Sequence, residues 1–417
     1  MRFITGMLTV SLVCGCGQAE DATNPVASPR VTETASVSSA LRIGAGGKPS
    51  FITPQLRRTL SKGAARLSDL QADAIGDNAR NGLDDDDPDD GGWDFTFPSS
   101  ATSHTSTASP ENTYGATALG VWAAVRAGAD AQRYRTTLLG AGLGSQQRPE
   151  IDSSTDFVFL PLLGELAEDQ GFSELARARY DAKVAAAGGV QALAEQARDV
   201  RHSQKLDALV LYDLTWYMLG AESLDAAFPG YGYGKDADTY ANVAAGAVTS
   251  SPPLFDVDDA GQRNYVQGLA WSLVIFHHAG APAALVTKIR SHLRDFQGAD
   301  GAWGYNAATP ADDLQSTAHA VEALSLTAGR DVQARLEALR GAGWLVRKQA
   351  ANGGWEYTAG SESSLIDAES MLALYLSHVA APGGALEPGA TSDIGQTAQA
   401  LSAPTAPAGT TLAAPPK

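Results

Sequence analysis

One pattern of residues occurs three times along the chain and ends each time in tryptophan. We call it the Gln–Trp repeat. Its three copies comprise Lys62, Leu67, Gln71 and Trp93; Lys288, Leu293, Gln297 and Trp303; and Arg340, Leu345, Gln349 and Trp355. The spacing is identical except that Trp93 comes about 16 residues later, after an acidic stretch. A repeat of this length predicts an array of similar supersecondary units, so it constrains the fold more than any single residue does.

Each repeat joins a helical segment to a turn. Apolar residues three and four positions apart precede the glutamine and predict a helix. Asn352-Gly353 and Asp300-Gly301 are turn signals that end it. We expect the tryptophan to pack on the preceding helix. We expect the glutamine amide to bond the free backbone N–H groups at the start of the next helix. The repeat therefore predicts a junction between an outer and an inner helix.

Between the repeats lie segments rich in Ala and Leu that are apolar on nearly all sides, as expected of fully buried helices. Several follow capping residues such as Asp313 and Ser363. These six segments span residues 113–125, 156–166, 205–219, 265–276, 316–326 and 364–376. Amphipathic, charged segments alternate with them, at 172–184, 281–296 and 331–347. Six inner and about six outer helices predict an all-α fold, a closed α/α toroid.

The third repeat is the most complete, reading Arg340-Gly341-x-x-Trp344-Leu345-x-x-x-Gln349-x-x-x-Gly353-x-Trp355. This sequence resembles the QW motif of the squalene/hopene cyclase and protein prenyltransferase repeat superfamily. The resemblance covers about residues 62–380 and implies an α/α toroid. It implies little about the reaction, because the QW residues are structural in that superfamily, and one fold serves many chemistries.

Composition divides the chain into a central domain and two tails. Residues 17–50 are rich in Ser, Thr, Ala and Pro, and residues 382–417 in Pro and Ala, without periodicity. Such segments bury too little apolar surface to become ordered. The chain as a whole is 44% hydrophobic, which suffices for one large core within residues 51–381. We therefore predict a single domain with disordered tails.

The first 16 residues predict export. Residues 3–13 form an apolar run typical of a signal peptide and too short to span a bilayer. The sequence that follows resembles a bacterial lipobox with Cys16 as the lipidated residue. Gly17 replaces the Asp that retains lipoproteins at the inner membrane, which favours the outer membrane or cell surface over the periplasm. The membrane would be contacted only through this anchor. An uncleaved apolar start is the alternative.

The acidic character of the chain bears on its partners. A net charge of −17 argues against nucleic acid. Many of the acidic residues lie in an insertion at residues 72–90, inside the first repeat, which resembles the Asp-rich calcium loops of secreted proteins. The match is imperfect at Ala79 and Pro88, and a solvated acidic loop is the alternative. The expected calcium ligands are Asp77, Asn81, Asp84, Asp86 and Asp89.

The catalytic groups of the resembled superfamily are incomplete in this chain. Protein prenyltransferases hold zinc with Asp, Cys and His, but the predicted domain has no cysteine, so we expect no zinc. Residues 84–87 match the Asp-x-Asp-Asp acid of class II cyclases only formally, because a strong proton donor needs a desolvated pocket. Asp312 and Asp313 precede an inner helix and are nearer analogues, although N-capping also explains an Asp there.

Polar residues on the inner helices are the main candidates for a ligand site. His319 and Glu322 share one helical face, and Asp367 and Glu369 lie on the last inner helix. We expect these four residues to face the central funnel, because burying a charge is costly and such charges are concentrated at functional sites. Exposure at a rim is the alternative.

Two further polar residues lie at the start of helices. Arg263 could serve as the base of a lyase, and His202 as a general base or ligand contact. Capping and solvation are the more common roles of such residues.

Three functions remain open from the sequence. The absent zinc cysteine and buried acid favour a binding or scaffold module, exported and lipid-anchored, with a ligand or partner at its central funnel. The first alternative is an enzyme of the terpene cyclase or prenyltransferase type, which an aromatic-rich funnel would favour. The second is a secreted polysaccharide lyase, which a polar groove with Arg263 among carboxylates would favour.

Overall fold

The computed structural model describes residues 53–71, 91–103, 114–147, 154–203, 210–250, 253–258, 265–306, 308–329 and 331–379. All of them belong to one compact unit, Ala35–Lys417. This unit is mostly helical, which confirms the predicted all-α class. No helix in the described ranges is long and apolar enough to cross a membrane.

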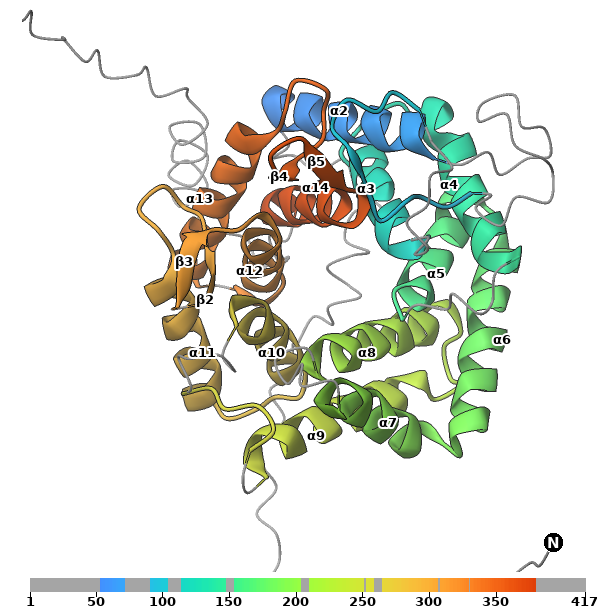
Figure 1. Cartoon of the computed structure of the whole chain (residues 1–417). Coiled ribbons are helices and arrows are strands. Elements are labelled where there is room, and N and C mark those ends of the chain that lie inside the picture. Colours follow the sequence, from blue (N-terminus) through green and yellow to red (C-terminus); the bar gives the residue numbers. More distant parts are fainter. Residues whose placement is uncertain are drawn as a thin grey trace, which may run out of the picture. The chain divides into compact units, whose positions relative to one another are not determined.

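Six helices correspond to the predicted inner segments. They are α3 (Gly115–Arg126), α5 (Asp156–Ala167), α8 (Val210–Ala227), α10 (Val266–His278), α12 (Leu314–Thr327) and α14 (Ser364–Val379). The remaining described helices are α2 (Pro54–Leu70), α4 (Ala131–Gln147), α6 (Gln170–Ala187), α7 (Val190–Ser203), α9 (Tyr233–Thr249), α11 (Ala283–Phe296) and α13 (Val332–Lys348). Figure 1 shows the first group inside the second.

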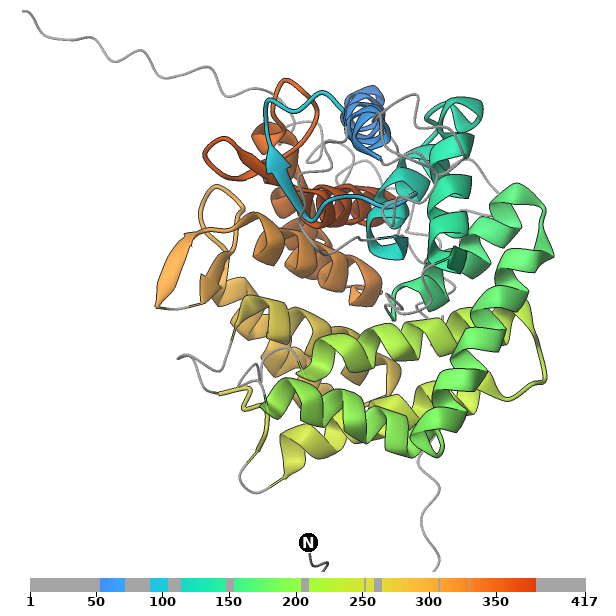
Figure 2. The same ribbon diagram turned by 45° about the vertical axis from the view of Figure 1, so that its right-hand side comes forward.

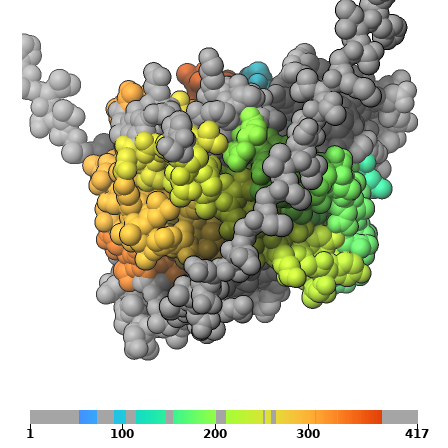
Figure 3. Space-filling view, turned by 90° about the horizontal axis from the view of Figure 1, so that it is seen from below, coloured from blue at the N-terminus to red at the C-terminus, as the bar shows by residue number. Residues whose placement is uncertain are grey.

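The six inner helices form a closed cycle of neighbours. Helix α3 contacts α5, which contacts α8, and the series continues through α10, α12 and α14 back to α3. Each of the other described helices contacts at least one of the six. Residues from the middle of the chain, coloured green to orange, form much of the coloured surface in Figure 3.

Burial differs between the two layers as the hydrophobic patterns predict. Every residue of α10 from Val266 to Phe276 is buried. In α11, only Ile289 and Leu293 are buried. A helix that packs on all sides needs apolar residues all round, whereas a helix with one solvent face needs only a stripe.

The tryptophans of the three repeats have equivalent environments. Trp93, Trp303 and Trp355 are fully buried. Each indole Nε1 donates a hydrogen bond to the carbonyl oxygen of the repeat's leucine in the preceding outer helix. The acceptors are Leu67 at 2.7 Å, Leu293 at 2.6 Å and Leu345 at 2.8 Å. The repeat therefore closes the end of each outer helix in the same way.

The glutamines of the repeats each make two hydrogen bonds, but not those expected from the sequence. The side-chain Nε2 donates to the carbonyl of a turn glycine and to a carbonyl within the next outer helix. The second acceptors are Thr137 for Gln71, Glu337 for Gln297 and Thr59 for Gln349, at 2.8, 2.9 and 2.9 Å. The expectation of bonds to free N–H groups is wrong, and after the second repeat the N–H groups at the starts of α12 and α13 are instead bonded by Asp313 and Asp331.

The third repeat connects the two ends of the described chain. Gln349 follows α13 and bonds Thr59 in α2, 290 positions earlier. Gly353 has a φ of +103°, and a Cβ there would lie 2.6 Å from the Lys62 carbonyl oxygen, so only glycine fits this contact. Gly301 has the same conformation and lies against the Arg340 carbonyl in the same way. The closing junction is thus a copy of an internal one.

The segments that connect the helices contain short β-strands. The strands are β1 (Thr96–Pro98), β2 (Gly304–Asn306), β3 (Thr309–Asp312), β4 (Glu356–Thr358) and β5 (Ser361–Ser363). The order β1-β5-β4 makes a three-stranded sheet, in which β1 and β5 pair antiparallel, and β2 and β3 form a second antiparallel pair. Figure 2 shows β1 beside the last strands, so this sheet also joins early and late parts of the chain.

Candidate functional site

Three ionisable side chains come together between α12 and α14. We call His319, Glu322 and Glu369 the inner cluster. Their exposed fractions are 2%, 1% and 7%, so the alternative of exposure at a rim is excluded for them. Nε2 of His319 lies 3.0 Å from Oε1 of Glu369. The i, i+3 spacing of His319 and Glu322 places both on one face of α12.

Trp271 of α10 determines the protonation of His319. Its indole Nε1 lies 3.2 Å from Nδ1 of the histidine. An indole N–H can only donate, so Nδ1 must accept and the imidazole is neutral, with its proton on Nε2. Nε2 of His319 lies near Oε1 of Glu369 without a hydrogen bond to it, and the same oxygen accepts from Nε2 of Gln315 at 3.4 Å. The two side chains next to Oε1 of Glu369, those of His319 and Gln315, are therefore both neutral.

Glu322 is the least satisfied member of the inner cluster. Burial raises the pKa of its carboxyl well above the ordinary value, and the nearby charge of Glu369 raises the pKa further. Oε1 of Glu322 and Oε2 of Glu369 have no hydrogen-bond partner among the described residues. This environment favours the protonated form of Glu322.

Aromatic rings from α8 and α10 adjoin the inner cluster. The ring of Tyr212 lies 5.3 Å from that of Trp271 and 6.0 Å from that of His319, measured between centroids. Trp216 lies 5.4 Å from Trp271. The sequence analysis did not predict that these aromatic residues lie beside the inner cluster, because an aromatic residue in an apolar helix usually belongs to the hydrophobic core. The i, i+4 spacing of Tyr212 and Trp216 was the available signal.

Asp367 has a different role from the one expected. Its Oδ1 accepts the backbone N–H of Trp355 at 2.7 Å. Thr317 occupies the matching place in the preceding repeat, where its Oγ1 accepts the N–H of Trp303 at 2.9 Å. Residues two apart on a helix point in nearly opposite directions, so Asp367 does not join Glu369. The sequence-based grouping of these two residues is therefore wrong.

The aspartates ahead of α12 also lie outside the inner cluster. Asp313 is the N-cap of α12, and its Oδ1 accepts the N–H of Ser316 at 2.6 Å. Asp312 is an exposed residue of β3, and its pKa is raised by partial burial and by neighbouring Asp300. Neither carboxyl is held in the desolvated surroundings that a strong proton donor requires.

Several candidates fall outside the described residues, so the predictions about them stay predictions. These are Arg263, the lipidation candidate Cys16 and the calcium candidates Asp77, Asn81, Asp84, Asp86 and Asp89. His202 lies in α7, but its side chain is not described. Within the described part of the chain, no group of three or more His, Cys, Asp or Glu side chains is placed to hold a metal ion.

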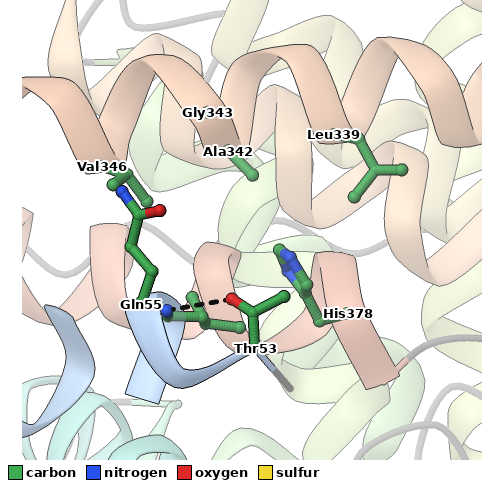
Figure 4. Close-up of a pocket in the computed structure, with 8 residues that line it drawn as sticks. Thr53, Gln55, Leu339, Ala342, Gly343, Val346 and His378 are labelled. Atoms are coloured by element: carbon green, nitrogen blue, oxygen red, sulfur yellow. Dashed lines mark hydrogen bonds between the residues drawn. The ribbon is translucent and has the colours of Figure 1, made fainter. Parts of the chain in front are cut away.

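A small pocket lies between α2, α13 and α14, on another part of the molecule (Figure 4). Thr53, Leu339 and His378 are among the residues that line it, and Thr53 caps α2 by accepting the N–H of Leu56. Burial lowers the pKa of the His378 imidazole to about 4, so this histidine is neutral at pH 7. The space accommodates little more than a water molecule. It is a packing gap rather than a ligand site.

Comparison with known proteins adds no assignment, since neither a family model nor a curated protein matches the chain.

Proposed function

We propose that this chain is an α/α toroid of the squalene/hopene cyclase and protein prenyltransferase repeat type, and that it binds a ligand at the inner cluster. Three observations support the architecture: the closed cycle of inner helices, the two layers, and the repeated Gln–Trp contacts. The third repeat supports closure most directly, because it bonds α13 to α2. Binding is the function that requires no catalytic group beyond those observed.

One observation carries the proposal of a ligand site: two buried carboxyls share a site with no charged partner from the described chain. Glu322 takes part in none of the hydrogen bonds or ion pairs between described residues. Leaving a polar group buried and unbonded costs on the order of 1–3 kcal/mol, and more for a charged one. Such costs persist in natural proteins mainly where function requires them.

Stability measurements can separate a ligand site from a structural one. Glu322→Met keeps the volume of the side chain and removes its polar atoms. We expect this variant to unfold at the same or a higher urea concentration than the native chain, because replacing poorly partnered buried charges with apolar groups is often neutral or stabilising. Glu362→Gln is the matched control, because Glu362 is equally buried but bonds Arg66 and Asn352.

The control variant should lose roughly 2–4 kcal/mol of unfolding free energy, since it leaves Arg66 without its counter-charge. If Glu322→Met is destabilised as much as Glu362→Gln, the inner cluster is structural and the proposed site is wrong.

A thermal-shift screen tests binding itself. Alkylguanidinium salts, alkylureas, isoprenoid alcohols and oligogalacturonides would be added separately to the native chain and to Glu322→Met. We expect at least one class to raise the melting temperature of the native chain, because a ligand that binds only the folded state stabilises it. The same class should have a smaller effect on the variant. No shift with any class would contradict the proposed binding function.

A terpene cyclase-type enzyme is the second candidate. A neutral carboxylic acid at Glu322, close to the helices that carry Tyr212, Trp216 and Trp271, is the observation that favours it. A buried acid can donate a proton, and aromatic faces stabilise cations. Incubation with squalene and with prenyl alcohols, followed by mass spectrometry, would show cyclised products. Their absence from the Glu322→Gln variant would assign the proton donor.

Two properties of the undescribed segments complete the proposal. We propose a lipid anchor at Cys16 and a calcium site in residues 72–90, on the sequence evidence alone. Metabolic labelling with an alkyne fatty acid should label the native chain and leave Cys16→Ser unlabelled. Calcium should raise the melting temperature relative to chelator, and equal melting in both would exclude the calcium site.

A further inference from the structure

The buried carboxyls of this protein are satisfied in two ways. At most positions a neighbouring helix or loop supplies a cation. Arg66 lies 2.9 Å from Glu362, Arg294 lies 2.5 Å from Glu337, and His278 lies 2.6 Å from Glu222; in each pair the carboxyl is buried. The inner cluster is different, because the described side chains from which Glu369 could accept a hydrogen bond, His319 and Gln315, are uncharged.

Within the described part of the chain, the elements packed on α12 bring no arginine or lysine to the carboxyl of Glu322. Helix α14 contributes Glu369, and α10 contributes Trp271 and Gln267, which are neutral. The buried acid of α13, Glu337, is already paired with Arg294. Strand β2 carries no charged residue. The unpartnered atoms of the inner cluster are one oxygen of Glu322, one oxygen of Glu369 and Nε2 of His319, so both carboxyls have an oxygen that lacks a donor among the described residues.

We propose that the ligand of the inner cluster is an organic cation of the guanidinium or ammonium class, which donates N–H bonds to Glu322 and Glu369. This inference depends on the proposed binding function. Acceptor oxygens are complementary to a group that only donates, and planar guanidinium groups bind carboxylates through paired hydrogen bonds. The ring of Tyr212 lies 6.0 Å from that of His319, measured between centroids, and the face of an aromatic ring attracts a positive charge.

Binding of the cation displaces one proton. Without the cation, burial and the negative charge of Glu369 raise the pKa of Glu322 and favour its protonated form. One positive charge placed against both carboxyls favours the ionised form of Glu322, which then releases its proton to the buffer. Affinity should therefore rise about tenfold per pH unit below the raised pKa of Glu322, and level off above it.

The experiment is calorimetric titration of the full chain with butylguanidinium chloride. Its guanidinium stays charged throughout the accessible pH range, so any pH dependence comes from the protein. Butylurea is the matched probe, with a similar shape and no charge. Two buffers of different ionisation enthalpy report the number of protons released. Asp312→Asn is the control variant, because Asp312 is an exposed carboxyl of β3.

We expect butylguanidinium to bind with release of about one proton, and butylurea to bind at least about tenfold more weakly, the difference typical of hydrogen bonds to a charged group. Glu322→Gln should weaken binding by about tenfold or more and abolish proton release, while Asp312→Asn should change neither. Circular dichroism and urea unfolding of Glu322→Gln would establish that it is folded.

Equal affinity for the two probes would overturn the cation assignment and leave the binding site in place. Absence of butylguanidinium binding would overturn the cation assignment as well. In that case the unfolding of Glu322→Met decides about the site itself: a neutral or stabilising effect retains the proposed function, and a destabilising effect removes it.

Discussion

Two regions of this protein bury a pair of carboxyls and solve the resulting problem differently. We call Arg66, Asn352, Glu362 and Asp367 the closure network. Its acids are 0% exposed, and those of the inner cluster, Glu322 and Glu369, are 1% and 7% exposed. In both regions burial is the main cause of a raised pKa, at Asp367 and at Glu322. Burial and pKa therefore do not distinguish the two regions.

Their bonding partners do distinguish them. Glu362 receives Arg66 and the amide of Asn352, and Asp367 receives the backbone N–H of Trp355. The Arg66–Glu362 bond joins residues 296 positions apart and holds early and late parts of the chain together. The inner cluster joins helices that already pack through extensive apolar surfaces. The fold explains the charges of the closure network, whereas no arginine or lysine of the described chain is paired with the carboxyls of the inner cluster.

The largest expected effect is that of Arg66→Met. Removing one partner from a buried ion pair leaves an uncompensated charge, so the variant should lose about 3–5 kcal/mol of unfolding free energy. Urea unfolding followed by circular dichroism measures this loss. Arg198→Met is the control, because Arg198 pairs with the exposed Asp199 and should lose at most about 1 kcal/mol. Equal losses in the two variants would mean that the buried ion pair of the closure network contributes no more to the unfolding free energy than an exposed one.

Gln349→Met should have the next largest effect. The substitution removes two hydrogen bonds and leaves the carbonyls of Thr59 and Gly353 without this donor, which should cost roughly 2–3 kcal/mol. Gln297→Met removes the matching pair of bonds at an internal junction. If the closing junction is a copy of the internal one, the two urea midpoints should fall by similar amounts. A loss confined to one variant would contradict their equivalence.

The pH dependence of stability should isolate Glu322. Its folded-state pKa is raised, so between the ordinary and the raised pKa the folded chain binds more protons than the unfolded chain. Stability from this group is complete below the ordinary pKa of a glutamate and is lost as pH rises through the folded pKa. Melting temperatures from pH 4 to 9 should thus fall less in Glu322→Gln than in the native chain. Parallel profiles would show that Glu322 does not titrate anomalously.

The sequence predicted the inner layer well, because that layer depends on a local property. A run such as Val266 to Phe276 is apolar on all sides and can only be a fully buried helix. The repeats also marked the junctions correctly. The bonds of Gln71, Gln297 and Gln349 were mispredicted, since the choice between donating and accepting depends on which backbone groups other residues already satisfy.

The candidate site was predictable only in part. His319 and Glu322 were paired from their spacing on one helix, but Trp271 and Tyr212 come from other helices, and no local signal connects them. Asp367 and Glu369 lie two positions apart, and their different directions follow from helix geometry. What distinguishes their roles is the partner of each carboxyl, which depends on residues distant in sequence.

The smallest expected effect is that of Asp367→Asn. Burial and the negative charge of Glu362 raise the pKa of Asp367, so its carboxyl tends to be neutral in the folded protein. Asparagine is also neutral and keeps the oxygen that accepts the Trp355 N–H. The unfolding free energy at pH 7 should therefore change by less than about 1 kcal/mol. Asp367→Val removes the acceptor and should cost more, about 1–3 kcal/mol. A large loss in Asp367→Asn would mean that Asp367 is ionised and acts on Arg66 by its charge, so that the closure network would hold two negative charges against one cation.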